Sequence, residues 1–254
     1  MASTTRKIVA GLAGAAFAAL SASSCVDNDG SLVIIGIMSP PVATGGTCAY
    51  TANIIGPFLS YGTLDVAFAD QYIPTLLIGN QMNPQGNQSI DRVETDNVIL
   101  QGAIVRVTDA AGATLDNYTV PGDGFVPPSS GGTAGIASFA TTLVSPTAAD
   151  AARQEVAANF GTKRLIAYVK VYGTTTGGTH LESGEVAFPV NACFGCLVTF
   201  PDGSDDEAQT VQPNCLATSS TGGSAITQPC LTGQDQYIDC RLCQGNVACD
   251  PAAR

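Results

Sequence analysis

The chain has no tryptophan, a single histidine (His180) and few charged residues, which make up 12% of its 254 residues. Long helix-forming runs are missing, whereas Gly, Thr, Ser, Ala and Val are abundant. This composition favours strands over helices. With one imidazole and no Gly-x-Ser-x-Gly elbow, the sequence offers little for a nucleophilic triad. It also lacks a cofactor fingerprint, so we expect no cofactor and no enzymatic activity.

Basic residues are scarce too, with ten Lys and Arg against 21 Asp and Glu. A nucleic-acid-binding protein needs a basic surface to displace phosphate counterions, so we expect no nucleic-acid partner. Long apolar runs are also lacking. The longest, Ile8 to Leu20, is far shorter than the ~20 residues that a membrane-spanning helix needs.

The first 24 residues are typical of an export signal, with a basic start, an apolar stretch and small residues before Cys25. Lipoprotein signal peptidase recognises small residues directly before a cysteine. Cys25 therefore resembles the lipidated first residue of a mature bacterial lipoprotein. Ala22 stands where such signals usually carry Leu, and Ala22 and Ser24 also suit the peptidase that releases secreted proteins. A secreted or periplasmic protein is the alternative.

The residue after the cysteine bears on the final location. Enteric lipoproteins that stay at the inner membrane carry Asp there, whereas this chain has Val26. The resemblance implies a protein of the outer membrane or cell surface, held there by acyl chains on Cys25. Residues 25–31 would form a short polar tether.

Residues 32–192 alternate strand-like runs with Gly, Pro, Asn and Asp, which is typical of an all-β antiparallel sandwich. From Leu165 to Tyr172 apolar side chains recur with period two. We expect eight or nine strands, drawn from Leu32–Met38, Cys48–Ile54, Thr63–Phe68, Tyr72–Ile78, Val98–Thr108, Leu115–Val120, Gly135–Leu143, Leu165–Tyr172 and Glu182–Val190.

One helix is predicted between Ser145 and Gly161. Ser145 can cap it, Pro146 suits its first position, and Gly161 can end it. Its place before the penultimate long strand resembles the helix between the fifth and sixth strands of immunoglobulin-like domains. The resemblance implies an immunoglobulin-like sandwich in which Tyr168 lies near the core tyrosine of such domains.

The composition changes at Cys193, where a tail (residues 193–254) begins that carries seven of the nine cysteines. It has too few apolar residues for a core of its own, so disulfides would have to hold it. Apart from Cys25, eight cysteines remain, an even number that suits four disulfides in an exported protein. We expect all eight to be oxidised: Cys48, Cys193, Cys196, Cys215, Cys230, Cys240, Cys243 and Cys249.

Seven tail cysteines cannot pair among themselves, so full oxidation within one chain requires Cys48 to bridge the sandwich to the tail. In an immunoglobulin-like sandwich the second strand begins at the end where the last strand finishes, which is beside Cys193. We therefore expect Cys48 to pair with Cys193, or else with Cys196. A free, buried Cys48 is the alternative.

The tail contains two CxxC pairs, Cys193–Cys196 and Cys240–Cys243. Four thiolates at such spacings could hold zinc, but thiols pair in an oxidising compartment. A thioredoxin-like redox pair needs a helix after its first cysteine, whereas Leu197–Phe200 is strand-like. We expect structural disulfides and no bound metal.

Two polar segments leave a binding function open. The turn Asp202–Glu207 concentrates carboxylates that could collect calcium, although a solvated acidic turn is the simpler interpretation. The Asn- and Gln-rich loop Gly79–Asn97 would lie on the rim of the sandwich, where binding residues often occur.

These observations predict a non-catalytic cell-envelope or surface lipoprotein whose sandwich is an interaction or structural module for a protein of the envelope. One alternative is an extracytoplasmic protein that binds a metal or small ligand; another is a hydrolase with paired carboxylates. A flat or apolar exposed sheet face would favour the first hypothesis, a retained metal the second, and a deep cleft with two close carboxylates the third.

Overall fold

A computed structural model describes residues 30–42, 48–87, 93–200, 215 and 228–253 of the chain. Among these residues, no helix combines the length and the apolar character needed to cross a membrane. The elements, in chain order, are β1 (Leu32–Met38), β2 (Phe58–Leu59), β3 (Gly62–Asp65), β4 (Thr75–Asn80), β5 (Val98–Asp109), β6 (Thr114–Val126), β7 (Gly135–Ala140), α2 (Pro146–Val156), β8 (Thr162–Thr175), β9 (His180–Glu182), β10 (Val186–Cys193), β11 (Val198–Thr199), β12 (Ile238–Asp239) and the 3₁₀ turns η3 (Cys240–Leu242), η4 (Val247–Cys249) and η5 (Pro251–Ala253).

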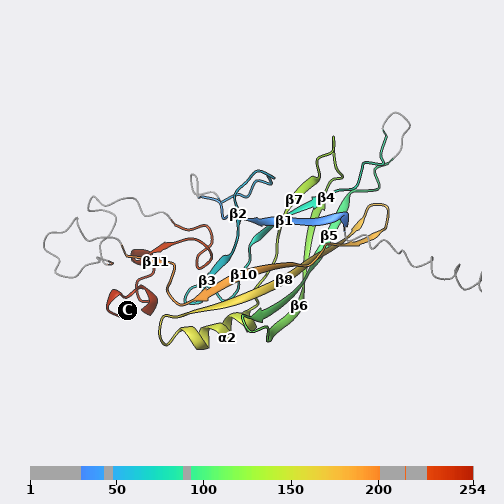
Figure 1. Cartoon of the computed structure of the whole chain (residues 1–254). Helices are drawn as coiled ribbons and strands as arrows, with labels where there is room; N and C mark the ends of the chain where they lie inside the picture. The colour runs from blue at the N-terminus through green and yellow to red at the C-terminus, as the bar shows by residue number, and fades with distance from the viewer. Residues whose placement is uncertain (1–29, 43–47, 88–92, 201–214, 216–227, 254) are drawn as a thin grey trace, which may run out of the picture.

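The strands form two large sheets around one apolar core (Figure 1). The first sheet has the order β2-β1-β4-β7; the second has the order β3-β10-β8-β5-β6, with β9 added to β8. Neighbouring strands in these sheets are antiparallel, except that β3 runs parallel to β10. The all-β, antiparallel class predicted from the sequence is confirmed.

The period-two pattern places the expected residues in the core. On β8 the side chains of Leu165, Ala167, Val169 and Val171 are fully buried, and the intervening residues face outward. Burying each such Val or Leu contributes about 1.5–3 kcal/mol, so the register of β8 is strongly fixed.

The predicted strand Cys48–Ile54 is wrong, because this segment has no regular structure. Asn53 accepts a hydrogen bond from the backbone N–H of Ile55 at 2.9 Å, a local turn that competes with strand pairing. Ile55 consequently points into solvent and is 87% exposed.

Helix α2 begins where the sequence predicts and ends earlier. Ser145 caps it by accepting the N–H of Ala148 at 3.3 Å, but the helix stops at Val156 rather than continuing to Gly161. Phe160 takes a left-handed φ of 52°, and the N–H of Gly161 closes the turn on the carbonyl of Val156. The helix lies against β6, β8 and β10 at one end of the core (Figure 1).

Candidate functional site

The loop that follows β10 carries the first CxxC pair. β10 ends at Cys193, and Gly195 takes a left-handed φ of 76°, which lets the chain turn back sharply. The turn brings Cys193 and Cys196 together in a disulfide, with Cα atoms 5.9 Å apart. Cys193 is buried, whereas Cys196 is exposed.

Asp65, the last residue of β3, lies beside this disulfide. It is opposite Cys193 in the parallel register of β3 and β10, and it is fully buried. Its carboxylate accepts hydrogen bonds from the backbone N–H groups of Gly195 at 2.7 Å and Leu197 at 3.0 Å. A carboxylate oxygen lies within 4.8 Å of the sulfur atoms of both Cys193 and Cys196. A buried acidic group therefore both holds the CxxC loop and adjoins its disulfide.

Two aromatic rings join the same loop to the end of α2. Phe194 packs edge-on against Phe160, with ring centroids 5.5 Å apart. A left-handed φ is unusual for a side chain as bulky as that of Phe160. An edge-to-face pair contributes about 0.5–1.5 kcal/mol beyond its buried area, which helps to offset this strain.

The tail returns to β3 and pairs with its open edge. The N–H of Asp65 donates to the carbonyl of Gly233 at 2.8 Å, and the N–H of Asp235 donates to the carbonyl of Thr63 at 3.0 Å. β3 thus lies between β10 on one side and residues 233–235 on the other. This pairing covers a strand edge that could otherwise pair with another chain.

Asp235 is a second carboxylate at this strand, and it is partly buried. It accepts hydrogen bonds from the backbone N–H of Thr63 and from the hydroxyl of Tyr72, both at 2.6 Å. Burial raises the pKa of Asp235, and the two hydrogen bonds offset part of that rise. Burial, together with the charge of Asp235, raises the pKa of Tyr72. The neighbouring Gln234 accepts the N–H of Ile73 at 2.6 Å, so consecutive tail side chains fix the β3–β4 connection.

All eight cysteines after Cys25 form disulfides in the structure, and Cys48, in the segment between β1 and β2, does form a bridge to the tail. Its expected partner was wrong, because Cys48 pairs with Cys230, at a Cα separation of 5.7 Å. The reason is that no strand begins at Cys48, and the tail runs back to this segment, where Gln236 donates to the carbonyl of Pro41 at 2.9 Å. The other disulfides are Cys193–Cys196, Cys215–Cys240 and Cys243–Cys249.

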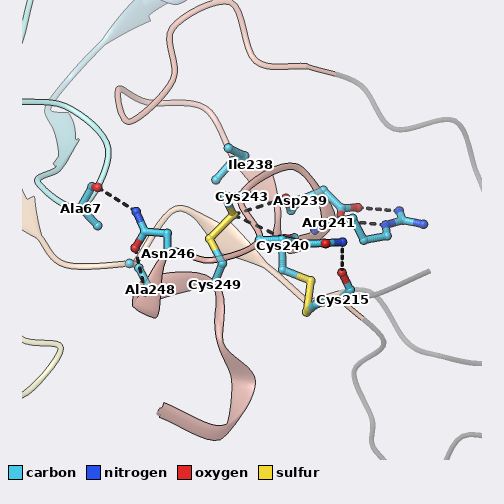
Figure 2. Close-up of a disulfide and its surroundings, with 12 residues drawn as sticks. Ala67, Cys215, Ile238, Asp239, Cys240, Arg241, Cys243, Asn246, Ala248 and Cys249 are labelled. Carbon is cyan, nitrogen blue, oxygen red and sulfur yellow. Dashed lines mark hydrogen bonds and ion pairs between the residues drawn. A yellow bond between two sulfur atoms is a disulfide. The ribbon is translucent and has the colours of Figure 1, made fainter. Parts of the chain in front are cut away.

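A small second core organises the end of the tail (Figure 2). Two disulfides close it, Cys215–Cys240 and Cys243–Cys249. The two cysteines of the second CxxC pair, Cys240 and Cys243, therefore belong to different bonds. Asn246 joins this core to the loop after β3 by donating to the carbonyl of Ala67 at 3.1 Å. The buried members are Val198, Cys215, Ile238, Cys240, Ala248 and Cys249.

The outward side of the second sheet, which we call the outer face, mixes apolar, aromatic and charged side chains. The guanidinium of Arg106 lies 3.9 Å from the ring centroid of Tyr168, a cation–π arrangement. Tyr168 is therefore a surface residue of β8 and not the core tyrosine that we expected; the fully buried tyrosine is Tyr72. On the neighbouring strand β5, Ile104 lies opposite Lys170 and is 38% exposed, and Ile99 lies farther along, opposite Thr174, and is 47% exposed.

The remaining candidate residues from the sequence do not converge on one site. Cys25 and the acidic turn Asp202–Glu207 lie outside the described residues, as do residues 88–92 of the loop Gly79–Asn97. In the described part of that loop, Glu94 accepts backbone N–H groups of Gly86 at 2.8 Å and of neighbouring residues. These hydrogen bonds lower the pKa of Glu94.

An open hollow of about 510 Å³ lies between the end of α2 and the start of β8. Its polar lining includes Asp109, Glu155 and Lys163, of which the last two form an ion pair. His180 does not line it and is an exposed residue at the start of β9.

Sequence reasoning missed Asp65 and Asp235. An acidic residue in a predicted strand or a polar tail is ordinarily exposed, so neither stood out. The one available signal was the position of Asp65 within the apolar run Thr63–Phe68.

No protein-family model matches the chain, and no curated protein matches it. Among solved structures, it is similar to a late embryogenesis abundant (LEA) protein studied in solution, at 12% sequence identity and a TM-score of 0.25. The match covers 52% of this chain and 67% of the LEA protein. At this TM-score the similarity supports no conclusion about fold or function.

Proposed function

We propose that the protein is a non-catalytic lipoprotein of the bacterial cell envelope or surface, whose β-domain binds an envelope protein. The four disulfides indicate an extracytoplasmic protein, because such bonds form and persist in oxidising compartments. The leader before Cys25 supports attachment through acyl chains, and two or three chains give stable anchoring where one gives only marginal binding.

We further propose that the domain is an immunoglobulin-like sandwich. Three features of the strand pairing support this: β4 lies between β1 and β7, β8 lies between β5 and β10, and β3 runs parallel to β10. The position of α2 between β7 and β8 agrees with a helix between the fifth and sixth strands of such a domain.

The observation that carries the binding proposal is the outer face of the second sheet. Ile99, Ile104, Tyr168 and Arg106 lie on adjacent strands of this face. Aromatic residues and Arg are enriched in protein–protein interfaces, where a few such residues supply most of the binding free energy. The ion pairs Arg106–Glu185 and Lys170–Glu182 add polar groups on the neighbouring strands.

The test uses two matched isoleucines on different sheets. Ile104 on the second sheet is 38% exposed, and Ile35 on the first is 37% exposed. Each is changed to Glu, and proteins recovered with the wild type and each variant from detergent-solubilised envelopes are quantified by mass spectrometry. We expect Ile104→Glu to reduce recovery of a specific partner at least ten-fold and Ile35→Glu to leave it unchanged, with equal melting temperatures. Equal recovery with both variants would contradict the proposal.

The anchor is tested separately by intact-mass measurement of the membrane fraction. We expect a mature chain that begins at Cys25 and carries acyl chains. A soluble chain with an unmodified N-terminus at Ser24 or Cys25 would exclude lipidation.

A further inference from the structure

We propose that Cys193, Cys196 and Asp65 form a thiol–disulfide exchange site that passes two electrons between extracytoplasmic dithiols and disulfides. This activity goes beyond the binding function and does not involve the outer face. The observation behind it is a cluster of an exposed cysteine, a buried cysteine and a fully buried carboxylate within 4.8 Å of both sulfurs.

The Cys193–Cys196 bond contributes little to the stability of the fold. It joins residues only three apart, whereas Cys48–Cys230 joins residues 182 apart and constrains the unfolded chain far more. The loop is also held by hydrogen bonds that do not depend on the disulfide. Asp65 accepts two N–H groups of the loop, and the carbonyl of Cys193 accepts the N–H of Val66 at 2.8 Å. The two sulfurs therefore stay close together after reduction.

The different exposure of the two cysteines gives each a separate part in exchange. A thiolate from a partner can reach only a sulfur at the surface, which makes Cys196 the residue that forms the mixed disulfide. Cys193 is 1% exposed and becomes the resolving cysteine, shielded from other thiols. Its sulfur lies 3.6 Å from the carbonyl oxygen of Leu64, an acceptor for the S–H of the reduced form.

Oxidation of the reduced pair then proceeds in two balanced steps. The thiolate of Cys196 attacks a partner disulfide, forming a mixed disulfide and releasing one partner thiolate. Cys193 next gives its proton to the carboxylate of Asp65 and attacks the sulfur of Cys196, which releases the second partner thiolate. That thiolate takes the proton, so the partner disulfide is reduced by two electrons as Cys193–Cys196 forms. In reverse, the same steps take two electrons from a dithiol, with Asp65 returning the proton to Cys193.

Asp65 takes the place of the helix that activates the cysteine thiol in thioredoxin-like sites. In thioredoxin-like sites a helix N-terminus lowers the thiol pKa, but here the short strand β11 follows Cys196. The fully buried carboxylate of Asp65, with an oxygen within 4.8 Å of both sulfurs, accepts and returns the proton instead. The charged groups on elements packed around β3 are Arg153, which donates to the carbonyl of Val66 at 2.9 Å, and Asp235 in the tail.

The first experiment compares the four disulfides within the wild-type protein. The oxidised full-length chain is treated with dithiothreitol without denaturant, and free thiols are trapped by alkylation and located by peptide mapping. We expect Cys193–Cys196 to be reduced at least ten-fold faster than Cys48–Cys230, with no change in the far-ultraviolet circular dichroism. Reduction of Cys193–Cys196 no faster than the other bonds would overturn the proposal.

The second experiment tests Asp65 with a matched control. Asp65→Asn removes the carboxylate beside the sulfurs, and Asp235→Asn removes a partly buried carboxylate bonded to the same strand. Reoxidation of the reduced pair by oxidised glutathione is followed from pH 4 to pH 9. We expect Asp65→Asn to slow it about ten-fold at pH 7 and to change the shape of the pH–rate profile, leaving only the dependence on the Cys196 thiolate, and Asp235→Asn to keep the wild-type profile.

An identical pH profile for wild type and Asp65→Asn would exclude the proton-transfer role. If Asp65→Asn does not fold, the comparison of disulfides in the wild type still decides whether exchange is selective for Cys193–Cys196. Stoichiometric zinc on the reduced pair that blocks alkylation and reoxidation would assign the cluster to metal binding and overturn the proposal.

Discussion

Two acidic residues, the fully buried Asp65 and the partly buried Asp235, organise the backbone around β3. Each carboxylate accepts hydrogen bonds from backbone N–H groups, those of Ala67, Gly195 and Leu197 for Asp65 and that of Thr63 for Asp235. Burying a carboxylate is unfavourable unless such bonds compensate it. Residues of this kind fix irregular connections that regular secondary structure cannot hold.

Asp235 gives a prediction of pH dependence. Its pKa in the folded state is raised above the ordinary value of 3.8, so the folded state favours the protonated acid. Its contribution to stability is therefore fully present below pH 3.8 and is lost as pH rises through the raised folded pKa. Asp235→Asn replaces it with a neutral side chain of the same shape. We expect the variant to gain stability relative to wild type as pH rises from 3 to 7.

Urea unfolding followed by circular dichroism at several pH values measures this difference. Glu94→Gln is the control for an acid with the opposite shift, because the pKa of Glu94 is lowered and its contribution is lost as pH falls. A constant difference between wild type and Asp235→Asn over this range would contradict the assignment.

At the scale of elements, local signals set where helix α2 begins, and packing sets where it ends. Helix α2 starts at the predicted cap, since Ser145 and Pro146 act within one turn of chain. Its end depends on Phe160, whose ring packs against Phe194 from the CxxC loop 34 residues later in the chain. A sequence window of one helix cannot contain that contact.

The helix cap can be tested directly. Ser145→Ala removes the acceptor for the N–H of Ala148 and also the hydrogen bond that the hydroxyl donates to Asp116. We expect a loss of about 1–2 kcal/mol in the free energy of unfolding, measured by urea denaturation. Thr147→Ala, at an exposed position of the same turn, should change stability by less than about 0.5 kcal/mol. Equal effects of the two substitutions would show that the cap does not hold the helix.

At the scale of the whole molecule, the tail is part of the fold and not a loose appendage. Residues 233–235 pair with β3, Asn246 bonds to the loop after β3, and Cys48–Cys230 joins the two regions covalently. The tail's own core is small, which agrees with the expectation that it needs disulfides. The hydrogen bonds to β3 are contacts that the composition of the tail did not indicate.

The disulfides should contribute unequally to stability. In the chain-entropy model, a bridge across 182 residues contributes up to about 5 kcal/mol, and one across six residues about 2 kcal/mol. We expect Cys48→Ser with Cys230→Ser to lower the free energy of unfolding clearly more than Cys243→Ser with Cys249→Ser. Urea denaturation of both double variants provides the measurement. If the second pair of substitutions destabilised the protein more, the long bridge would not be the main constraint on the unfolded chain.

The sequence by itself determined the all-β class, the inward face of β8, the start of α2 and the need for Cys48 to meet the tail. These follow from local periodicity, from capping and from the parity of the cysteines, none of which requires knowledge of distant contacts. Only the tertiary structure decided that Cys230 is the partner of Cys48, that Tyr72 is the fully buried tyrosine, and that Asp65 adjoins Cys193 and Cys196. Asp65 and Cys193 are 128 positions apart and meet only because β3 and β10 pair in parallel, a long-range register that the sequence pattern leaves open.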